Sequence, residues 1–512
     1  MVGSVNASAV YGVEARTIAV EANITSGTKH YIVGLPDNTV KESWSRVESA
    51  IKTSGFEMPR RKVIINLAPA DIKKEGSAYD LPIAISIIKA SGQLISRVLD
   101  EFIIMGELAL DGTVRAIRGA LPIAIEARRK KFRGIILPKD NATEAGVIGE
   151  LEIIGVTSLE EAVRFLNGKL MISPVRVNIN EIFSNYANQY DVDFADVQGQ
   201  DNIKRAMEIA AAGSHNALMI GPPGSGKTML AKRLPTILPP LSLNEALETT
   251  KIHSVAGKLG SNASLMTTRP FRSPHHTVSD VALVGGGGIP QPGEISLAHN
   301  GILFLDELPE FKRSVLEVMR QPLEDRKVVI SRAKIAIEYP SNFMLIASMN
   351  PCPCGYYNHP DKQCVCTPVQ VQRYLNRISG PLLDRIDLHV EVTPVPFDQM
   401  IESRKTETSL EIRARVVRAR EIQIERFKNF PGIYSNAMMS SQMVKEICII
   451  DNAGQILLKT AMEKLGLSAR AYDRILKASR TIADLAGECD IKAEHLAEAI
   501  QYRSLDREGW VA

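Results

Sequence analysis

The sequence predicts an α/β protein in three parts: an N-terminal α/β domain, a central domain built on a parallel sheet, and a helical C-terminal domain. Three observations support this. The central apolar runs NALMIG, GILFLDE and FMLIASMN have the length and continuity of buried parallel strands. Short β-branched runs alternate with helical patterns before them, and long helical patterns follow them. A chain of 512 residues is also too long for a single hydrophobic core.

The order of these elements sets the predicted domain boundaries. In residues 1–168, KVIINLAPA, FIIMGELAL and GIILP predict strands, whereas DLPIAISIIKASGQLI and LPIAIEARRKKF predict helices. Residues 169–190 have weak periodicity and predict a linker. The parallel-sheet domain is expected over residues 191–395. Long periodic segments such as SLEIRARVVRAREIQIERF and YDRILKASRTIADLAG predict a helical lid over residues 396–512.

Composition excludes several classes of protein. The apolar fraction of 45% and the charged fraction of 23% are those of an ordinary globular protein. No apolar run reaches the 18 residues of a membrane span, so no membrane association is expected. The N-terminus lacks the basic start and apolar core of a secretory signal, so a cytoplasmic location is expected. A net charge of +3 neither requires nor excludes nucleic acid.

The run GPPGSGKT fits the phosphate-binding pattern G-x-x-x-x-G-K-[ST]. A strand candidate precedes it and a helical pattern follows it, which disfavours a chance glycine loop. Backbone N–H groups of such a loop surround phosphate oxygens, the lysine reaches the β- and γ-phosphates, and the hydroxyl holds Mg²⁺. ATP and Mg²⁺ are therefore the predicted cofactors. The predicted nucleotide-binding residues are Gly221, Pro222, Pro223, Gly224, Ser225, Gly226, Lys227 and Thr228.

Polar residues after the later strands complete a predicted hydrolytic site. Asp306 and Glu307 follow one strand; Asp306 suits Mg²⁺ and Glu307 suits the base that orients water. Asn350 follows the next strand and is placed to contact the water or the γ-phosphate. Arg385 in LLDRID is predicted to act on a neighbouring subunit's nucleotide, and Arg470 in LSARAYDR to reach the γ-phosphate from the lid. A lone arginine is more often solvated or ion-paired. Only the position of these two arginines in the chain, behind the P-loop, favours a catalytic role.

These motifs resemble the ComM/YifB family of magnesium-chelatase-like AAA+ ATPases. The stretches GELALDG, DVQGQ, RPFRSPHH, GGGGIPQPGEISLAHNGILFLDEL and SMNPCPCG carry the resemblance, which extends over essentially the whole chain. It implies a homo-hexamer with ATP at the subunit interfaces, and Arg385 completing the neighbour's site. It also implies DNA helicase and branch-migration activity in natural transformation and recombination. The alternatives are a chelatase-type motor and a protein-remodelling ATPase that does not act on DNA.

Two polar inserts are the candidate DNA contacts, on single-stranded or branched DNA. The first, TTRPFRSPHHTVSDVALVGGGG, is too polar and glycine-rich for a core segment, and in related motors it projects into the pore. The second, VVISRAKIAIEYPSNF, alternates like a β-hairpin. Basic side chains on protruding elements suit phosphate contacts, although pairing with neighbouring subunits is the alternative. The candidate residues are Arg269, Arg272, His275, His276, Arg332 and Lys334.

The N-terminal domain resembles the proteolytic domain of Lon, a ribosomal-S5-domain-2-like fold that carries a Ser–Lys dyad. In KEGSAYD the place of the dyad serine falls on Ala78, with Ser77 one position early. In VRAIRGAL the place of the dyad lysine falls on Leu121. Neither side chain can attack a carbonyl or accept a proton, so a non-proteolytic domain is expected. Lys73, Lys74 and Ser77 are expected to lie in a solvated turn.

The stretch NPCPCGYYNHPDKQCVCTP holds four of the chain's six cysteines as two C-x-C pairs. Four thiolates suit a tetrahedral structural zinc site, with a metal-free loop and a redox pair as the alternatives. His359 is a substitute ligand, and Cys448 and Cys489 are expected to be ordinary buried residues. The candidate zinc ligands are Cys352, Cys354, Cys364 and Cys366.

Overall fold

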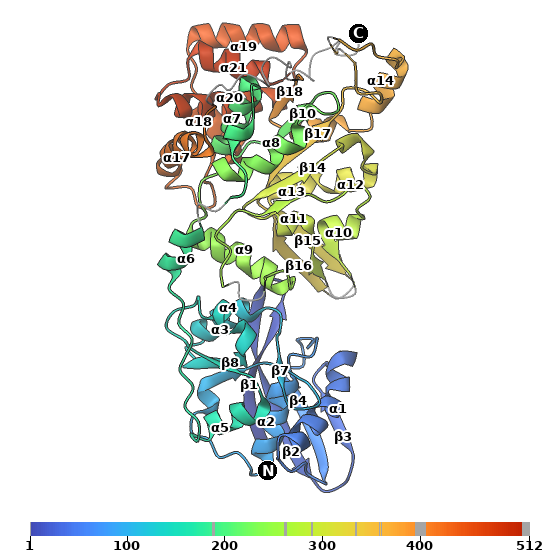
Figure 1. Cartoon of the computed structure of the whole chain (residues 1–512), viewed down its shortest axis with the longest axis vertical. Helices are drawn as coiled ribbons and strands as arrows, with labels where there is room; N and C mark the ends of the chain where they lie inside the picture. The colour runs from blue at the N-terminus through green and yellow to red at the C-terminus, as the bar shows by residue number, and fades with distance from the viewer. Residues whose placement is uncertain are drawn as a thin grey trace. The chain divides into compact units, whose positions relative to one another are not determined.

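The computed structural model describes residues 2–186, 190–260, 264–287, 290–332, 335–357, 359, 361–394 and 406–503, with the side chains of 184–186, 332 and 335 left out (Figure 1). The described residues form two compact units. The first lies within Met1–Tyr186, Ser242–Thr267 and Ser331–Tyr339; the second lies within Ala187–Leu241, Thr268–Ile330 and Pro340–Ala512. The α/β class with a helical C-terminal region is confirmed, and the domain boundaries given above stay predictions.

The first unit contains a seven-stranded mixed sheet in the order β3-β4-β2-β1-β5-β8-β9. Its strands are β1 (Val2–Tyr11), β2 (Glu14–Thr25), β3 (His30–Val33), β4 (Lys62–Ala68), β5 (Phe102–Ile104), β8 (Gly134–Pro138) and β9 (Glu152–Val156). The strands β1 and β2 form a long antiparallel hairpin, which is absent from the strands predicted above. Every second residue of β4 is buried, whereas β8 is buried throughout, as expected for half-covered and fully covered strands.

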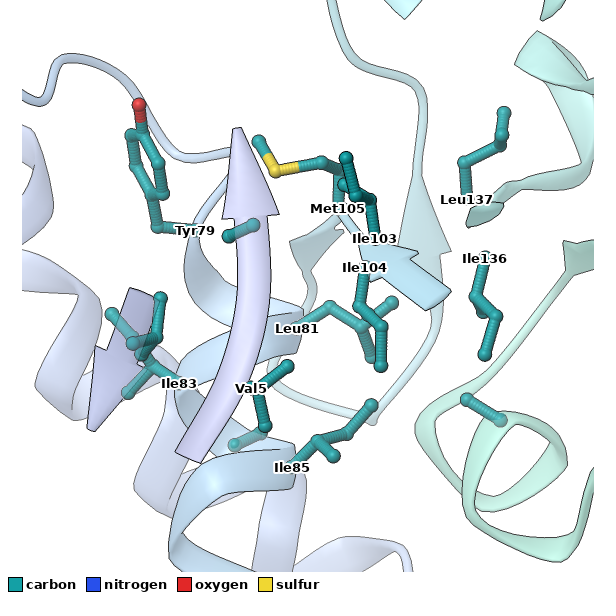
Figure 2. Packing of buried hydrophobic residues seen from close by; sticks show 14 of the residues in the cluster. Val5, Tyr79, Leu81, Ile83, Ile85, Ile103, Ile104, Met105, Ile136 and Leu137 are labelled. Atoms are coloured by element: carbon teal, nitrogen blue, oxygen red, sulfur yellow. The ribbon is translucent and has the colours of Figure 1, made fainter. Parts of the chain in front are cut away.

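Helices complete the first unit, and several of them pack on this sheet to form its core. They are α1 (Asn38–Thr53), α2 (Asp80–Ala90), α3 (Ala120–Arg129), α4 (Lys139–Ala145), α5 (Leu159–Leu166), α6 (Ile179–Tyr186) and α9 (Leu243–Val255). Nearly every residue of α2 is buried, because this helix lies against β1 and β2. Figure 2 shows its side chains beside those of the strands: Leu81, Ile83 and Ile85 with Val5, Ile103, Ile104 and Ile136. Helix α6 lies inside the segment predicted as a linker.

Ser77 and Lys74, the polar residues near the place of the Lon dyad serine, each have another partner. The Ser77 hydroxyl donates to a carboxylate oxygen of Glu107, and the Lys74 ammonium donates to the carbonyl of Pro69. Lys74 is fully buried, so the expectation of a solvated turn is wrong for this residue. Burial lowers the pKa of Lys74.

The second unit is built on a five-stranded sheet in the order β11-β14-β17-β10-β18. Its strands are β11 (Phe271–Arg272), β14 (Ile302–Leu305), β17 (Met344–Met349), β10 (Ala217–Ile220) and β18 (Leu388–Glu391). All four neighbouring pairs are parallel, so the carboxyl ends of the strands meet at one edge of the sheet. The predicted strands β10, β14 and β17 are confirmed. The first polar insert contributes β11 to the edge of this sheet, and neither residue of that strand is buried.

Helices complete the second unit, and many begin at side-chain caps. They are α7 (Asp201–Gly213), α8 (Lys227–Arg233), α10 (Asp280–Val284), α11 (Glu294–Leu297), α12 (Arg313–Val318), α13 (Arg320–Asp325), α14 (Pro368–Leu375), α15 (Gly380–Leu383), α17 (Ser409–Arg426), α18 (Ser441–Ile447), α19 (Asn452–Leu465), α20 (Ala469–Ala486) and α21 (Ala493–Gln501). Thr408 and Glu411 form a capping box at α17, and Ser468 caps α20. Each such cap contributes about 1 kcal/mol.

Two-stranded sheets account for the remaining strands. The second polar insert forms β15 (Lys327–Arg332) and β16 (Ile335–Pro340), which confirms the predicted pair of strands. The others join β6 (Glu107–Leu108) to β7 (Val114–Arg115) and β12 (Gly285–Gly286) to β13 (Gln291–Pro292). Among the described residues, no helix has both the length and the apolar character needed to cross a membrane.

Candidate nucleotide-binding site

The GPPGSGKT loop connects the end of β10 to the start of α8 at the carboxyl edge of the parallel sheet. Gly224 and Gly226 have φ angles of +79° and +85°, the left-handed region that favours glycine. A Cβ on Gly224 would meet no atom within 4 Å, so glycine is favoured there by the backbone conformation and not by a lack of space. The loop therefore has the backbone geometry that directs successive N–H groups towards an anion.

The Lys227 ammonium lies inside this loop. Its Nζ donates to the carbonyls of Gly221 and Pro222 at 2.8 and 2.9 Å and lies 3.3 Å from Oδ1 of Asn350. Burial lowers the pKa of Lys227, and the nearby carboxylates of Asp306 and Glu307 act in the opposite direction. The predicted lysine and the predicted asparagine thus meet at one point.

The Asp306 carboxylate joins the loop to the neighbouring strands. Its Oδ2 accepts a 2.7 Å hydrogen bond from Oγ1 of Thr228, and its Oδ1 accepts from the Ser348 hydroxyl and the backbone N–H of Glu307. A hydroxyl and a carboxylate at this separation are oxygen ligands of the kind that Mg²⁺ takes, so these residues fit the ion. Sequence reasoning missed Ser348, because only the pairing of β14 with β17 brings it to Asp306.

Glu307 has an unusual backbone conformation. Its φ of +55° is left-handed, and such strain in a residue other than glycine is typical of functional sites. Its side chain is 58% exposed, and Oε2 lies 3.7 Å from Nδ1 of His276. The sequence predicted His276 as a DNA contact, whereas the structure puts its ring beside the predicted base.

Gln200 is a further residue at the loop that sequence reasoning left without a role. Its Nε2 donates to the carbonyl of Ser225 at 2.9 Å and to that of Thr393 at 3.3 Å. It belongs to the DVQGQ stretch, whose similarity to family sequences was the only available signal. Gln200 thereby connects the segment before α7 to the P-loop.

The two predicted arginines lie in different surroundings. Arg385 is buried; its Nη2 forms an ion pair with Glu324, and its Nη1 donates to the carbonyl of Pro381 at 2.5 Å. Arg470 is 58% exposed at the start of α20, with Nη1 3.6 Å from Asp384. Their catalytic roles stay predictions.

A buried ion pair connects the lid helix α20 to the LLDRID run. Asp387 is buried and accepts from Nη1 of Arg474 at 2.6 Å and from the backbone N–H of Asn216 at 2.9 Å. Burial alone would raise the pKa of Asp387, but Arg474 and His215 outweigh it, and the pKa lies below its usual range. The pair fixes α20 next to β18. No sequence signal marked it, because the partners are 87 residues apart.

Three of the remaining DNA candidates have partners within the chain. Arg269 donates to the carbonyls of Pro239 and Asn300, both at 2.7 Å. Arg272 forms a two-point ion pair with Glu294 at 2.6 and 2.8 Å. Nδ1 of His275 lies 2.9 Å from the Thr277 hydroxyl. Lys334 and the side chain of Arg332 lie outside the described residues, and the DNA contacts stay predictions.

Three of the four clustered thiols approach one another closely. Sγ of Cys352 lies 3.3 Å from that of Cys354 and 3.7 Å from that of Cys364, and the Cys354 and Cys364 sulfurs are 3.6 Å apart. All four cysteines are free, and all four sulfurs lie within 4.8 Å of one another. Tetrahedral zinc with bonds of about 2.3 Å requires sulfurs about 3.8 Å apart, so the thiols fit this ion.

The other expectations about this loop and the remaining cysteines have mixed outcomes. Nδ1 of His359 accepts from the backbone N–H groups of Asp361 and Lys362 at 3.0 and 3.1 Å, which leaves that nitrogen unsuited to a metal. Cys448 is buried as expected, and burial raises its pKa to about 12. Cys489 is exposed, so the expectation of a buried residue is wrong.

Parallel strands that bring a P-loop, an acid pair and a polar residue to one edge, next to a helical region, are typical of AAA+ ATPases, which use ATP and Mg²⁺. Family profiles for the magnesium chelatase subunit ChlI match residues 20–141 and 193–400, and its C-terminal profile matches residues 406–503. The chain is therefore a magnesium-chelatase-like AAA+ ATPase.

Relatives support this assignment along nearly the whole length. The chain is 46% identical over 499 residues to competence protein ComM of Haemophilus influenzae, covering 97% of this chain and 96% of ComM. It is also 46% identical to the YifB proteins of Salmonella typhimurium and Escherichia coli, covering 98% of this chain and 97% of each relative. The chain belongs to the ComM/YifB family of magnesium-chelatase-like AAA+ ATPases.

Proposed function

We propose that this chain is an ATP-driven ring motor that moves DNA, acting in the cytoplasm as a hexameric helicase and branch-migration factor in natural transformation and recombination. The near-full-length similarity to a competence protein carries this proposal. The site supports the ATPase step, because the P-loop, Asp306 and Asn350 lie together at one edge of the sheet.

Each residue of the site has a proposed task in hydrolysis. The P-loop backbone and Lys227 hold the phosphates of ATP, and Thr228 and Asp306 hold Mg²⁺. Bound MgATP supplies the phosphoanhydride bond and the cation that neutralises its charge. Glu307 orients the attacking water and takes its proton, while Asn350 positions the water or the γ-phosphate. Arg385 acts from the neighbouring subunit, for which its guanidinium must leave Glu324, and Arg470 acts from the lid.

The proposal predicts that DNA stimulates ATP hydrolysis. The ATPase rate should rise severalfold when single-stranded or forked DNA is added at low salt, because a ring motor couples ATP turnover to movement along the DNA that it binds. Steady-state ATPase measurements with single-stranded, forked, double-stranded and no DNA test this. If the ATPase rate is the same with and without each DNA but rises with a protein client or a companion subunit, the chelatase-type or protein-remodelling alternative is favoured.

The hairpin formed by β15 and β16 is the proposed DNA contact. Replacing Arg332 and Lys334 with alanine should weaken DNA binding equally for all sequences and reduce the slope of log affinity against log salt by about 1 to 2, because phosphate contacts carry no base information. ATPase activity without DNA should persist. The variant Arg128→Ala, which removes a charge paired with Glu150 on the first unit, is the matched control. An unchanged affinity and salt slope would exclude the hairpin as a contact.

The proposal includes a structural zinc ion held by Cys352, Cys354, Cys364 and Cys366. The sulfur spacing supports it, as do the backbone N–H groups of Tyr357 and Cys366, which donate to Sγ of Cys352 and Cys364 at 3.3 and 3.4 Å. Such N–H contacts stabilise thiolates. Purified protein should carry about one zinc per chain, and its affinity for zinc should fall at low pH because protons compete for the thiolates.

Elemental analysis of protein prepared without chelators decides this point. Cys366→Ser should lose the metal, whereas Cys489→Ser, at an exposed thiol away from the cluster, should keep it. Substoichiometric metal, with all four clustered thiols open to alkylation in the native protein, would refute the zinc site.

A further inference from the structure

The cysteine loop lies directly against the P-loop. Gly355, which follows Cys354, is buried and has a φ of +84°. A Cβ built on Gly355 would lie only 2.5 Å from Cδ and 2.8 Å from Cγ of Pro223, the second proline of GPPGSGKT. Carbon atoms do not approach this closely without displacement, so the backbone of the cysteine loop is already in van der Waals contact with the phosphate-binding loop.

The same segment contacts the phosphate site at a second point. Asn350 begins the cysteine loop, and its Oδ1 lies 3.3 Å from Nζ of Lys227. Cys352 and Cys354, two of the four thiols, lie between these two contacts. The P-loop is therefore supported on its proline side and at its lysine by one short stretch that also carries half of the metal ligands.

The turn that presents Gly355 is built around the thiols. The N–H of Gly355 donates to the carbonyl of Cys352 at 3.0 Å, and the N–H of Tyr357 donates to the Cys352 sulfur at 3.3 Å. The sulfur of Cys364, ten residues beyond Cys354, lies 3.7 Å from the Cys352 sulfur and 3.6 Å from the Cys354 sulfur. Among residues 351–357, Pro351, Cys352 and Gly355 are buried, Cys354, Tyr356 and Tyr357 are partly buried, and Pro353 is exposed.

We infer that this four-thiolate site, which takes a thiophilic divalent cation such as Zn²⁺, braces the P-loop through Gly355 and Asn350, so that nucleotide affinity depends on metal occupancy. The inference rests on the proposed zinc site. The metal joins the pair Cys352 and Cys354 to the pair Cys364 and Cys366, which removes most of the alternative conformations of the loop between them. Without this cross-link, the turn that positions Gly355 against Pro223 is held only by its own hydrogen bonds and packing.

Gly355→Ala tests the contact with Pro223 separately from the metal. The added methyl group pushes on Pro223 while the four thiols remain, so the protein should keep about one zinc per chain and bind a fluorescent ADP analogue about tenfold more weakly. Gly432→Ala is the matched control. Gly432 has the same φ of +84°, but its Cβ would meet nothing within 4 Å, so this variant has the same backbone strain and should keep the parental ADP affinity.

Metal removal and replacement test the dependence on occupancy in the unaltered protein. Wild-type protein is treated with a chelator, freed of it, and assayed for ADP binding in excess Mg²⁺ before and after Zn²⁺ alone is returned. Affinity should fall about tenfold or more and recover with zinc, which excludes irreversible unfolding as the cause. Protein that never carries zinc would overturn the metal site and this inference together. If zinc-loaded Gly355→Ala protein, or wild-type protein from which zinc has been removed, keeps the parental ADP affinity, the inference is overturned and the zinc site and the ATPase function are left standing.

Discussion

Glu307→Gln protein is expected to bind ATP and Mg²⁺ with parental affinity and to hydrolyse ATP at least about 100-fold more slowly, the usual contribution of a general base. Glutamine keeps the size of the side chain but cannot take a proton from water. The contacts that hold the nucleotide are untouched, because the Thr228 hydroxyl stays on Asp306 and Lys227 stays in the P-loop. Equilibrium binding and steady-state hydrolysis, measured on the same preparation, separate the two effects.

Two further variants make this measurement specific. Glu310→Gln removes a carboxylate three residues away, one that is ion-paired with Arg377 at 2.9 Å, and should leave hydrolysis close to the parental rate. Lys227→Ala should lose ATP binding itself. Parental turnover in Glu307→Gln would show that another group is the base.

Arg385→Ala is expected to abolish hydrolysis alone and to regain part of it when mixed with Lys227→Ala protein. If Arg385 acts on the neighbour's nucleotide, an interface is active when an intact P-loop meets an intact arginine. Random mixing of equal amounts into rings provides this at about a quarter of the interfaces. ATPase rates measured across mixing ratios, after subunit exchange, should pass through a maximum near equal amounts.

The matched control mixes two variants of the same site. Lys227 and Glu307 belong to one chain's site, so Lys227→Ala mixed with Glu307→Gln should regain nothing at any ratio. Arg385 is also buried and paired with Glu324, so a purely structural role is the competing explanation. Lack of rescue, together with a lowered thermal stability of Arg385→Ala, would favour that explanation.

Local sequence patterns predicted much of the site because its parts are local in the chain. An apolar strand followed directly by a polar residue predicts a side chain at the carboxyl edge of a parallel sheet, and this argument put Asp306 and Asn350 at one edge, while the phosphate-binding pattern added Lys227. The C-x-C spacing predicted that the thiols gather. The same reasoning missed Ser348 and Gln200, whose partners lie on other elements.

Charge and exposure were harder to predict from the sequence, because a side chain's partner is decided by packing. Arg272 looked like a free basic residue in a polar insert, yet the sheet pairing of β11 brings it to Glu294. Lys74 looked like part of a solvated turn but is buried, and Cys489 looked buried but is exposed.

The sequence alone therefore determined the family, the α/β class, the phosphate loop and the residues that follow each strand, since these depend on neighbours within a few positions. Only the tertiary structure decided which distant groups meet: His276 with Glu307, Asp387 with Arg474, and Gly355 with Pro223. Those contacts join segments from 31 to 132 residues apart, and their geometry follows from strand order and side-chain packing, which no local pattern of residue types encodes.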